Sequence, residues 1–152
     1  MKKIIAIVAL GFTGLLVSCN KNSESSPKDK AIDMITANAW ETESVQHDTD
    51  GNLTFQYENF TIAFTKKTSS NYSGEYVVAN GGTAFPDAFG QWKILDDLKT
   101  IQFDNGQEFE VDLSNGKLKL DFYIVNSGGG RIGWGRMSGL SGHFIFVLKP
   151  VS

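Results

Sequence analysis

The 152-residue sequence contains a single cysteine, Cys19, and only two histidines. One thiol excludes an internal disulfide framework and a metal site built from several thiolates. His47 and His143 do not form a ligand-spaced pair, so a metal site or a Ser/His/Asp triad would need partners from distant segments. We therefore expect no metal, no cofactor and no catalytic residues, and we rank an enzyme last among the function classes.

Basic residues are also in deficit. The chain has 14 Lys and Arg against 17 Asp and Glu, and without Lys2 and Lys3 the charge is about −5. Nucleic-acid-binding domains usually carry a basic patch, which this composition does not offer. We expect no nucleic-acid partner, and we expect any attachment to a membrane to be covalent rather than electrostatic.

A charge-free apolar run at residues 4–17 follows Lys2 and Lys3. This run is shorter than the roughly 20 residues that a membrane-spanning helix needs. A positive start, a short apolar middle and a small residue before the cleavage point are typical of a secretory signal. We predict a signal peptide at residues 1–18.

The four residues Leu16-Val17-Ser18-Cys19 resemble the lipobox of bacterial lipoproteins. The resemblance implies cleavage after Ser18 and a palmitate-bearing lipid on Cys19. The alternative is an ordinary secreted protein. Asn20 differs from the Asp retention signal of well-studied lipoproteins, so we predict a cell-envelope protein anchored in the outer membrane of a Gram-negative bacterium.

Two parts follow the signal. Residues 19–29 contain no large apolar residue and are predicted to form a flexible tether. Residues 30–152 form one predicted domain, which is long enough to bury a core. Its first element is a helix at residues 30–37, with Ile32 and Ile35 on one face and Asn38 ending the helix in a left-handed conformation.

The remainder predicts an all-β fold. Apolar and polar residues alternate, as in Phe60, Ile62 and Phe64, and this period of two is typical of half-buried strands. Asp-Gly and Asn-Gly pairs at residues 50, 105 and 115 favour tight hairpins. The predicted strands are 40–46, 60–64, 72–78, 91–95, 100–103, 108–113, 118–124 and 144–149. An antiparallel up-and-down barrel of about eight strands follows, with a two-sheet sandwich as the alternative.

This arrangement resembles the short bacterial lipocalin-like lipoproteins of the calycin type. The resemblance rests on Asn38-Ala39-Trp40 after the helix, on the strand 90–94 and on the final strand 142–148. It implies a barrel that binds a small apolar ligand. The sequence departs from the classical Gly-x-Trp opening, because Asn38 occupies the place of the glycine.

Two connections are candidate functional loops, since long loops in compact domains are often functional. Residues 80–90 carry Phe85 and Phe89, and residues 126–142 carry Trp134 between Arg131 and Arg136. Trp and Arg are enriched in binding hot spots. The predicted ligand-binding residues are Trp40, Phe85, Phe89, Trp92 and Trp134, although core packing is the stronger expectation for Trp40. The predicted partner-binding residues are Arg131, Trp134 and Arg136.

Two further patterns are weak. Gly128, Gly130 and Gly133 match a G-x-G-x-x-G spacing, but no helix follows to supply a phosphate site. Asp48, Asp50 and Asn52 match the start of a calcium loop without its later Gly and Glu, so a hairpin is favoured.

Three functions follow. The first is a membrane-anchored lipocalin-like protein that binds a small hydrophobic ligand. The second is a protein–protein interaction module of the envelope, with a filled barrel and active loops at 80–90 and 126–142. An unrecognised enzyme is the third.

Overall fold

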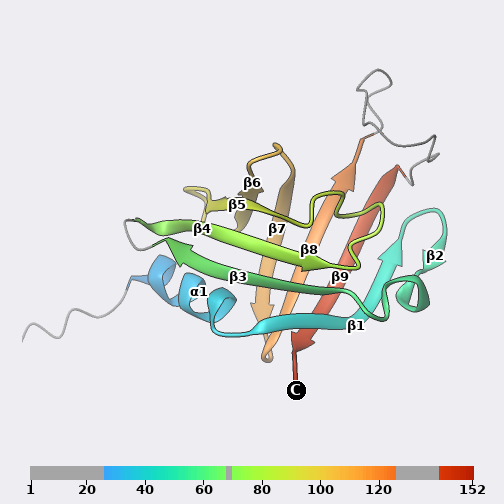
Figure 1. Ribbon diagram of the computed structural model, residues 1–152, viewed down its shortest axis with the longest axis horizontal. Coiled ribbons are helices and arrows are strands. Elements are labelled where there is room, and N and C mark those ends of the chain that lie inside the picture. The colour runs from blue at the N-terminus through green and yellow to red at the C-terminus, as the bar shows by residue number, and fades with distance from the viewer. Residues whose placement is uncertain (1–25, 68–69, 126–140) are drawn as a thin grey trace, which may run out of the picture.

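The computed structural model describes residues 26–67, 70–125 and 141–152, which form one antiparallel sheet and one α-helix. The strand order is β2-β1-β3-β4-β5-β6-β7-β8-β9, and β1 also pairs with β9. This second pairing closes eight of the strands into a barrel, and β2 is a short extension outside it (Figure 1). The predicted up-and-down barrel is confirmed, and the sandwich alternative is wrong.

The elements match the predicted strands within a few residues. The helix α1 spans Pro27–Thr36 and the 3-10 helix η1 spans Thr54–Tyr57. The strands are β1 Ala39–His47, β2 Gly51–Asn52, β3 Thr61–Lys67, β4 Ser70–Ala79, β5 Phe89–Ile94, β6 Thr100–Phe103, β7 Glu108–Ser114, β8 Lys117–Ile124 and β9 Gly142–Pro150.

The closing pair joins segments that lie a hundred residues apart in the sequence. β1 pairs with β9 from Trp40 opposite Pro150 to His47 opposite Phe144, with an irregularity between Thr42 and Ser44. Side chains alternate across the closed sheet, and β9 places Phe144, Phe146 and Leu148 inside, all buried. Closure pairs the edge strands that an open sheet would leave exposed.

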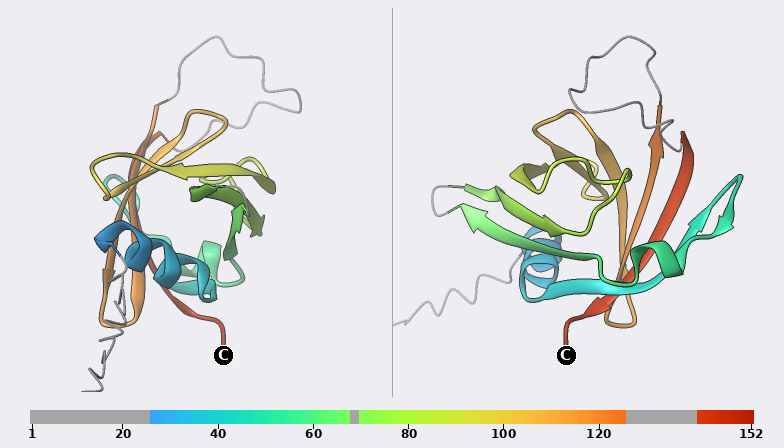
Figure 2. Two further views of the ribbon diagram at one scale, coloured as in Figure 1. Left: turned by 90° about the vertical axis from the view of Figure 1, so that its left-hand side faces the viewer. Right: turned by 45° about the vertical axis from the view of Figure 1, so that its right-hand side comes forward.

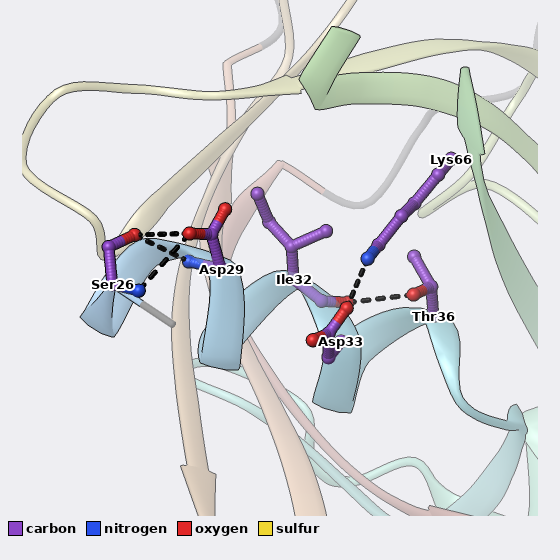
Figure 3. A network of polar contacts seen from close by, with 6 residues as sticks. All are labelled: Ser26, Asp29, Ile32, Asp33, Thr36 and Lys66. Carbon is purple, nitrogen blue, oxygen red and sulfur yellow. Dashed lines mark hydrogen bonds and ion pairs between the residues drawn. The ribbon is translucent and has the colours of Figure 1, made fainter. Parts of the chain in front are cut away.

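The helix begins at Pro27, three residues before the predicted domain start. Ser26 caps it: its hydroxyl accepts from the Asp29 backbone N–H at 3.1 Å, and the Asp29 carboxylate accepts from the Ser26 backbone N–H at 3.1 Å (Figure 3). This reciprocal capping box, followed by proline in the first turn, fixes the start of the helix. Residues 27–29 of the predicted tether therefore belong to the helix.

The predicted left-handed end at Asn38 is wrong, because Asn38 does not have a positive φ. The last turn is satisfied in other ways. The Ala37 N–H donates to the Met34 carbonyl at 3.4 Å, and the Trp40 indole Nε1 donates to the Ile35 carbonyl at 2.9 Å. These bonds give two of the carbonyls in the last turn a donor without a left-handed residue.

The helix lies at one end of the barrel, where it contacts β3, β4 and β7 (Figure 2). Its buried residues Ile32 and Ile35 join the same hydrophobic core as the inward side chains of the strands. Lys66 at the end of β3 pairs with Asp33 on the outward side of the helix (Figure 3). In the described residues, no helix is both long enough and apolar enough to cross a membrane.

Candidate functional site

The barrel interior is packed with aromatic rings. Phe60, Phe109, Phe122 and Phe146 are each 3% exposed or less, and neighbouring rings meet at 4.8 Å for Phe109 and Phe122 and at 5.2 Å for Phe60 and Phe146. Tilted and edge-to-face contacts of this kind stabilise a core beyond the area that they bury. These four rings form a cup inside the barrel, which we call the aromatic cup.

Phe85 fills the aromatic cup, although it comes from a connection and not from a strand. Its ring lies 4.9 Å from Phe60, 5.4 Å from Phe109, 5.4 Å from Phe122 and 5.3 Å from Phe146. It is 4% exposed. The segment 80–88 between β4 and β5 therefore places an apolar side chain at the centre of the barrel, where a small ligand would lie in a hollow barrel.

Three side-chain hydrogen bonds hold this segment over the barrel end. Asn80 Nδ2 donates to the Asn59 carbonyl at 2.7 Å, and Gln107 Nε2 donates to the Ala84 carbonyl at 3.3 Å. Asn105 Nδ2 donates to Asp87 Oδ2 at 2.7 Å. Two of these bonds lie at exposed positions, and exposed hydrogen bonds are the first to open in local fluctuations.

Backbone geometry in the same segment shapes the turn. Asn80 has a φ of 56° and Gly82 a φ of 57°, a region that non-glycine residues rarely adopt. A Cβ on Gly81 would lie 2.6 Å from the Cβ of Phe85. Glycine at position 81 is therefore required for Phe85 to turn inward.

Trp92 and Trp40 lie in the packed interior, at 1% and 3% exposure. Trp92 Nε1 lies 3.1 Å from the carbonyl oxygens of both Thr65 and Glu75, between β3 and β4. This site also requires Gly74, because a Cβ there would lie 2.9 Å from the indole nitrogen. Both indoles thus donate hydrogen bonds to backbone carbonyls and fix neighbouring elements, and the expectation of core packing for Trp40 agrees with this.

Phe89 points away from Phe85. It begins β5 and is 77% exposed on the outer surface, opposite Val77 of β4, which is 59% exposed. The structure thus separates the two phenylalanines that sequence analysis grouped in one loop. Cys19, Arg131, Trp134 and Arg136, and the glycines at 128, 130 and 133, lie outside the described residues, so their predicted roles stay predictions.

Tyr76 lies beside the aromatic cup, with its ring stacked on Phe103 at 3.8 Å. The side chain covers Gly90, the residue paired with it on β5, and a Cβ on Gly90 would lie 2.7 Å from the Tyr76 hydroxyl. Burial, together with the charges of Asp104 and Asp87, raises the pKa of Tyr76 to about 12. The phenol is therefore neutral at physiological pH.

The outer surface carries a hollow of about 380 Å³ over β4, β5 and β6. Its polar side chains include Gln91, Lys93, Gln102 and Asp104, with Trp92 and Phe103 at its base. Asp104 Oδ2 accepts a hydrogen bond from the Gln91 backbone N–H at 3.1 Å. The predicted ligand residue Trp92 thus borders a polar hollow outside the barrel while its ring is buried inside.

The two histidines lie near each other at the rim of the barrel where β9 begins. His47 is 5% exposed, with Nδ1 2.9 Å from Asp50 Oδ2 and Nε2 3.4 Å from Asp48 Oδ1. His143 pairs with Asp121 and stacks on Tyr123 at 4.5 Å. Asp48 and Asp50 lie in the hairpin turn between β1 and β2, where both contact the buried His47. This agrees with the prediction of a hairpin rather than a calcium loop.

Burial opposes the charged form of Asp121, but hydrogen bonds from His143 and Lys119 outweigh it and lower the pKa of Asp121. The backbone N–H of Asp48 donates to the His143 carbonyl at 3.1 Å. A hydrogen bond from the backbone of His143, with others from Thr49, lowers the pKa of Asp48. Within residues 26–67, 70–125 and 141–152 no group of three His, Cys, Asp or Glu is placed to hold a metal ion.

Sequence reasoning missed the residues that hold the 80–88 segment. Gln107 and Asn80 are ordinary polar residues in the sequence, and only the packed fold brings them to Ala84 and Asn59. The Asn105-Gly106 pair was identified as a turn, but its contact with Asp87 spans 18 residues and has no local signal.

Comparisons with protein-family models and with curated proteins find no match for this chain. The barrel is established by the structure, and the lipocalin-like family stays a prediction.

Proposed function

We propose that this protein is a lipid-anchored β-barrel of the bacterial cell envelope that binds a small apolar ligand in place of the Phe85 side chain. The observation that carries the proposal is that a loop residue, not a strand residue, fills the aromatic cup. Loops open at a lower free-energy cost than barrel strands. Cys19, the last residue of the lipobox-like sequence, supplies the anchor.

The chemistry of the cup favours an uncharged, ring-bearing ligand. The four rings present faces and edges, which suit aromatic and aliphatic ring systems and exclude unpaired charge. Because Phe85 competes with the ligand, the apparent affinity depends on the population of the open loop.

The test is a titration of the full mature chain with N-phenyl-1-naphthylamine, a neutral apolar fluorophore. We expect saturable binding by the wild type. Gln107→Ala removes the donor to Ala84 without altering the interior, and the loss of one hydrogen bond of about 1 kcal/mol should tighten the apparent affinity roughly fivefold. Phe55→Ala, at a residue that is 83% exposed, is the matched control and should leave the affinity unchanged.

A second candidate function is favoured by the packing itself. The described interior is filled by the cluster that contains Phe85, which suits a rigid scaffold that acts through its surface. If the wild type shows no saturable binding and Gln107→Ala shows no increase in affinity, ligand binding is wrong. The envelope interaction module is then the favoured function.

A further inference from the structure

An uninterrupted apolar row crosses the outside of the barrel. The registers align Ala39 of β1 with Ala63 of β3, Ala63 with Val77 of β4, and Val77 with Phe89 of β5. The Val151 N–H donates to the Ala39 carbonyl at 2.9 Å, which extends the row beyond the end of β9. We call these five residues the apolar row.

The side chains of the apolar row face outward. Phe89 is 77% exposed, Val77 59% and Val151 44%, while Ala39 is exposed and Ala63 is half-buried. β1, β3, β4 and β5 lie side by side in Figure 1, so the row forms a stripe across one face. An exposed apolar stripe of this extent marks a contact surface more often than isolated apolar residues do.

The borders of the row carry little net charge. On one side Glu41 pairs with Lys149 at 3.1 Å, next to Thr61 and Ala79. On the other side Glu75 is flanked by the neutral Thr65 and Gln91. A strongly charged partner finds no complementary surface here, whereas a zwitterionic lipid surface needs none.

The length of chain before α1 bears on which partner can reach the apolar row. Cys19 lies seven positions before Ser26, and this length of chain spans at most about 25 Å when fully extended. Ala39 follows α1 by three residues, and a ten-residue helix is about 15 Å long. A lipid on Cys19 therefore holds the apolar row within reach of the bilayer, at a high effective concentration.

We propose that the apolar row is the face by which the anchored domain rests on the lipid surface of its membrane. The proposal rests on the lipid anchor proposed at Cys19. Phe89 and Val77 enter the boundary between headgroups and acyl chains, and the covalent lipid supplies the lasting attachment.

The first experiment uses the acylated full-length mature protein in phosphatidylcholine vesicles. Acylation consumes the only native thiol, so Val77→Cys and Tyr123→Cys each offer one site for a nitrobenzoxadiazole label. Tyr123 is 67% exposed on β8 and serves as the matched control. We expect blue-shifted emission, quenched by brominated acyl chains, at position 77 and aqueous emission at position 123. Equal emission at both positions would overturn the proposal.

The second experiment separates the row from the anchor. In the unanchored Cys19→Ser chain, we expect Val77→Ser/Phe89→Ser to lower partition into the same vesicles about tenfold. Unchanged partition would overturn the role of the row. A concentration-dependent blue shift without vesicles would also overturn it, because the row would then be an interface between copies of the chain. If the anchor itself is wrong, the wild type will not float with vesicles and its Cys19 will accept the label.

Discussion

Single residues in this barrel act through contacts that their sequence neighbours do not reveal. Phe85 and Phe89 are four positions apart, yet one fills the aromatic cup and the other lies on the apolar row. The difference arises because Gly81 allows the backbone to turn Phe85 inward, whereas β-pairing with Val77 directs Phe89 outward. The same residue type can therefore lie inside or outside the barrel, and the strand register and the turn geometry decide which.

The outer face of β8 and β9 offers a pH-dependent prediction. The pKa of Asp121 is lower in the folded protein than its ordinary value of 3.8, despite partial burial, because His143 and Lys119 donate to the carboxylate. A lowered pKa of an acid contributes stability that is fully present above the unfolded pKa and is lost as the pH falls through the folded pKa. Below pH 3.8 the wild type should therefore lose stability more steeply than Asp121→Asn.

Urea unfolding at pH 6 and at a series of pH values below 4 measures this difference. His143→Gln removes one of the two donors and should show an intermediate loss below pH 4. Parallel pH curves for the wild type and Asp121→Asn would show that the carboxylate contributes nothing to acid sensitivity.

At the scale of elements, α1 is defined by its caps as much as by its apolar face. Ser26 and Asp29 satisfy each other's backbone N–H groups, and the Thr36 hydroxyl donates to the Ile32 carbonyl at 2.8 Å (Figure 3). Ser26→Ala removes the capping acceptor and should lower the free energy of unfolding by about 1 kcal/mol.

The urea midpoint of the full mature chain measures the effect of the cap. Ser26→Thr keeps a hydroxyl at the same position and should stay within about 0.5 kcal/mol of the wild type. If both variants unfold at the wild-type midpoint, the capped turn does not contribute to the free energy of unfolding of the barrel.

The strands could be predicted from the sequence because each carries its own alternation. Ile62 and Phe64, or Leu118 and Leu120, are spaced two residues apart, and the structure buries them all. Asn115 and Gly116 were identified as a hairpin turn, and both have positive φ, at 54° and 72°. Strand and turn signals of this kind are local, so they do not depend on the rest of the fold.

The candidate site was less predictable because it depends on pairings between distant segments. Two phenylalanines within a loop do not show which one turns inward. The apolar row was not predicted at all: Ala39, Ala63, Val77 and Phe89 come from four strands and align only through three registers. The end of α1 was predicted wrongly at Asn38 because the capping group comes from Trp40.

At the scale of the whole molecule, the same strand, β9, closes the barrel and fills part of its interior. β9 lies between β1 and β8 and contributes Phe146, whose ring lies 4.9 Å from Tyr57, 5.2 Å from Phe60, 5.3 Å from Phe85 and 5.7 Å from Phe122. These partners come from η1, from two connections and from β8. The last strand therefore joins parts of the core that are distant in sequence, and such non-local contacts slow folding.

Phe146→Ala should destabilise the entire barrel and not only its last strand. Removal of a fully buried ring from a packed core costs about 3–5 kcal/mol, a large share of the 5–15 kcal/mol by which a domain is stable. Because one cluster spans all parts of the barrel, far-UV circular dichroism and tryptophan fluorescence should report the same lowered urea midpoint. Phe55→Ala removes a ring that is 83% exposed and should change the free energy of unfolding by less than about 0.5 kcal/mol. Separate transitions for the two signals in Phe146→Ala would mean that β9 detaches while the remaining strands keep their core. The other strands would then fold without the closure of the barrel by β9.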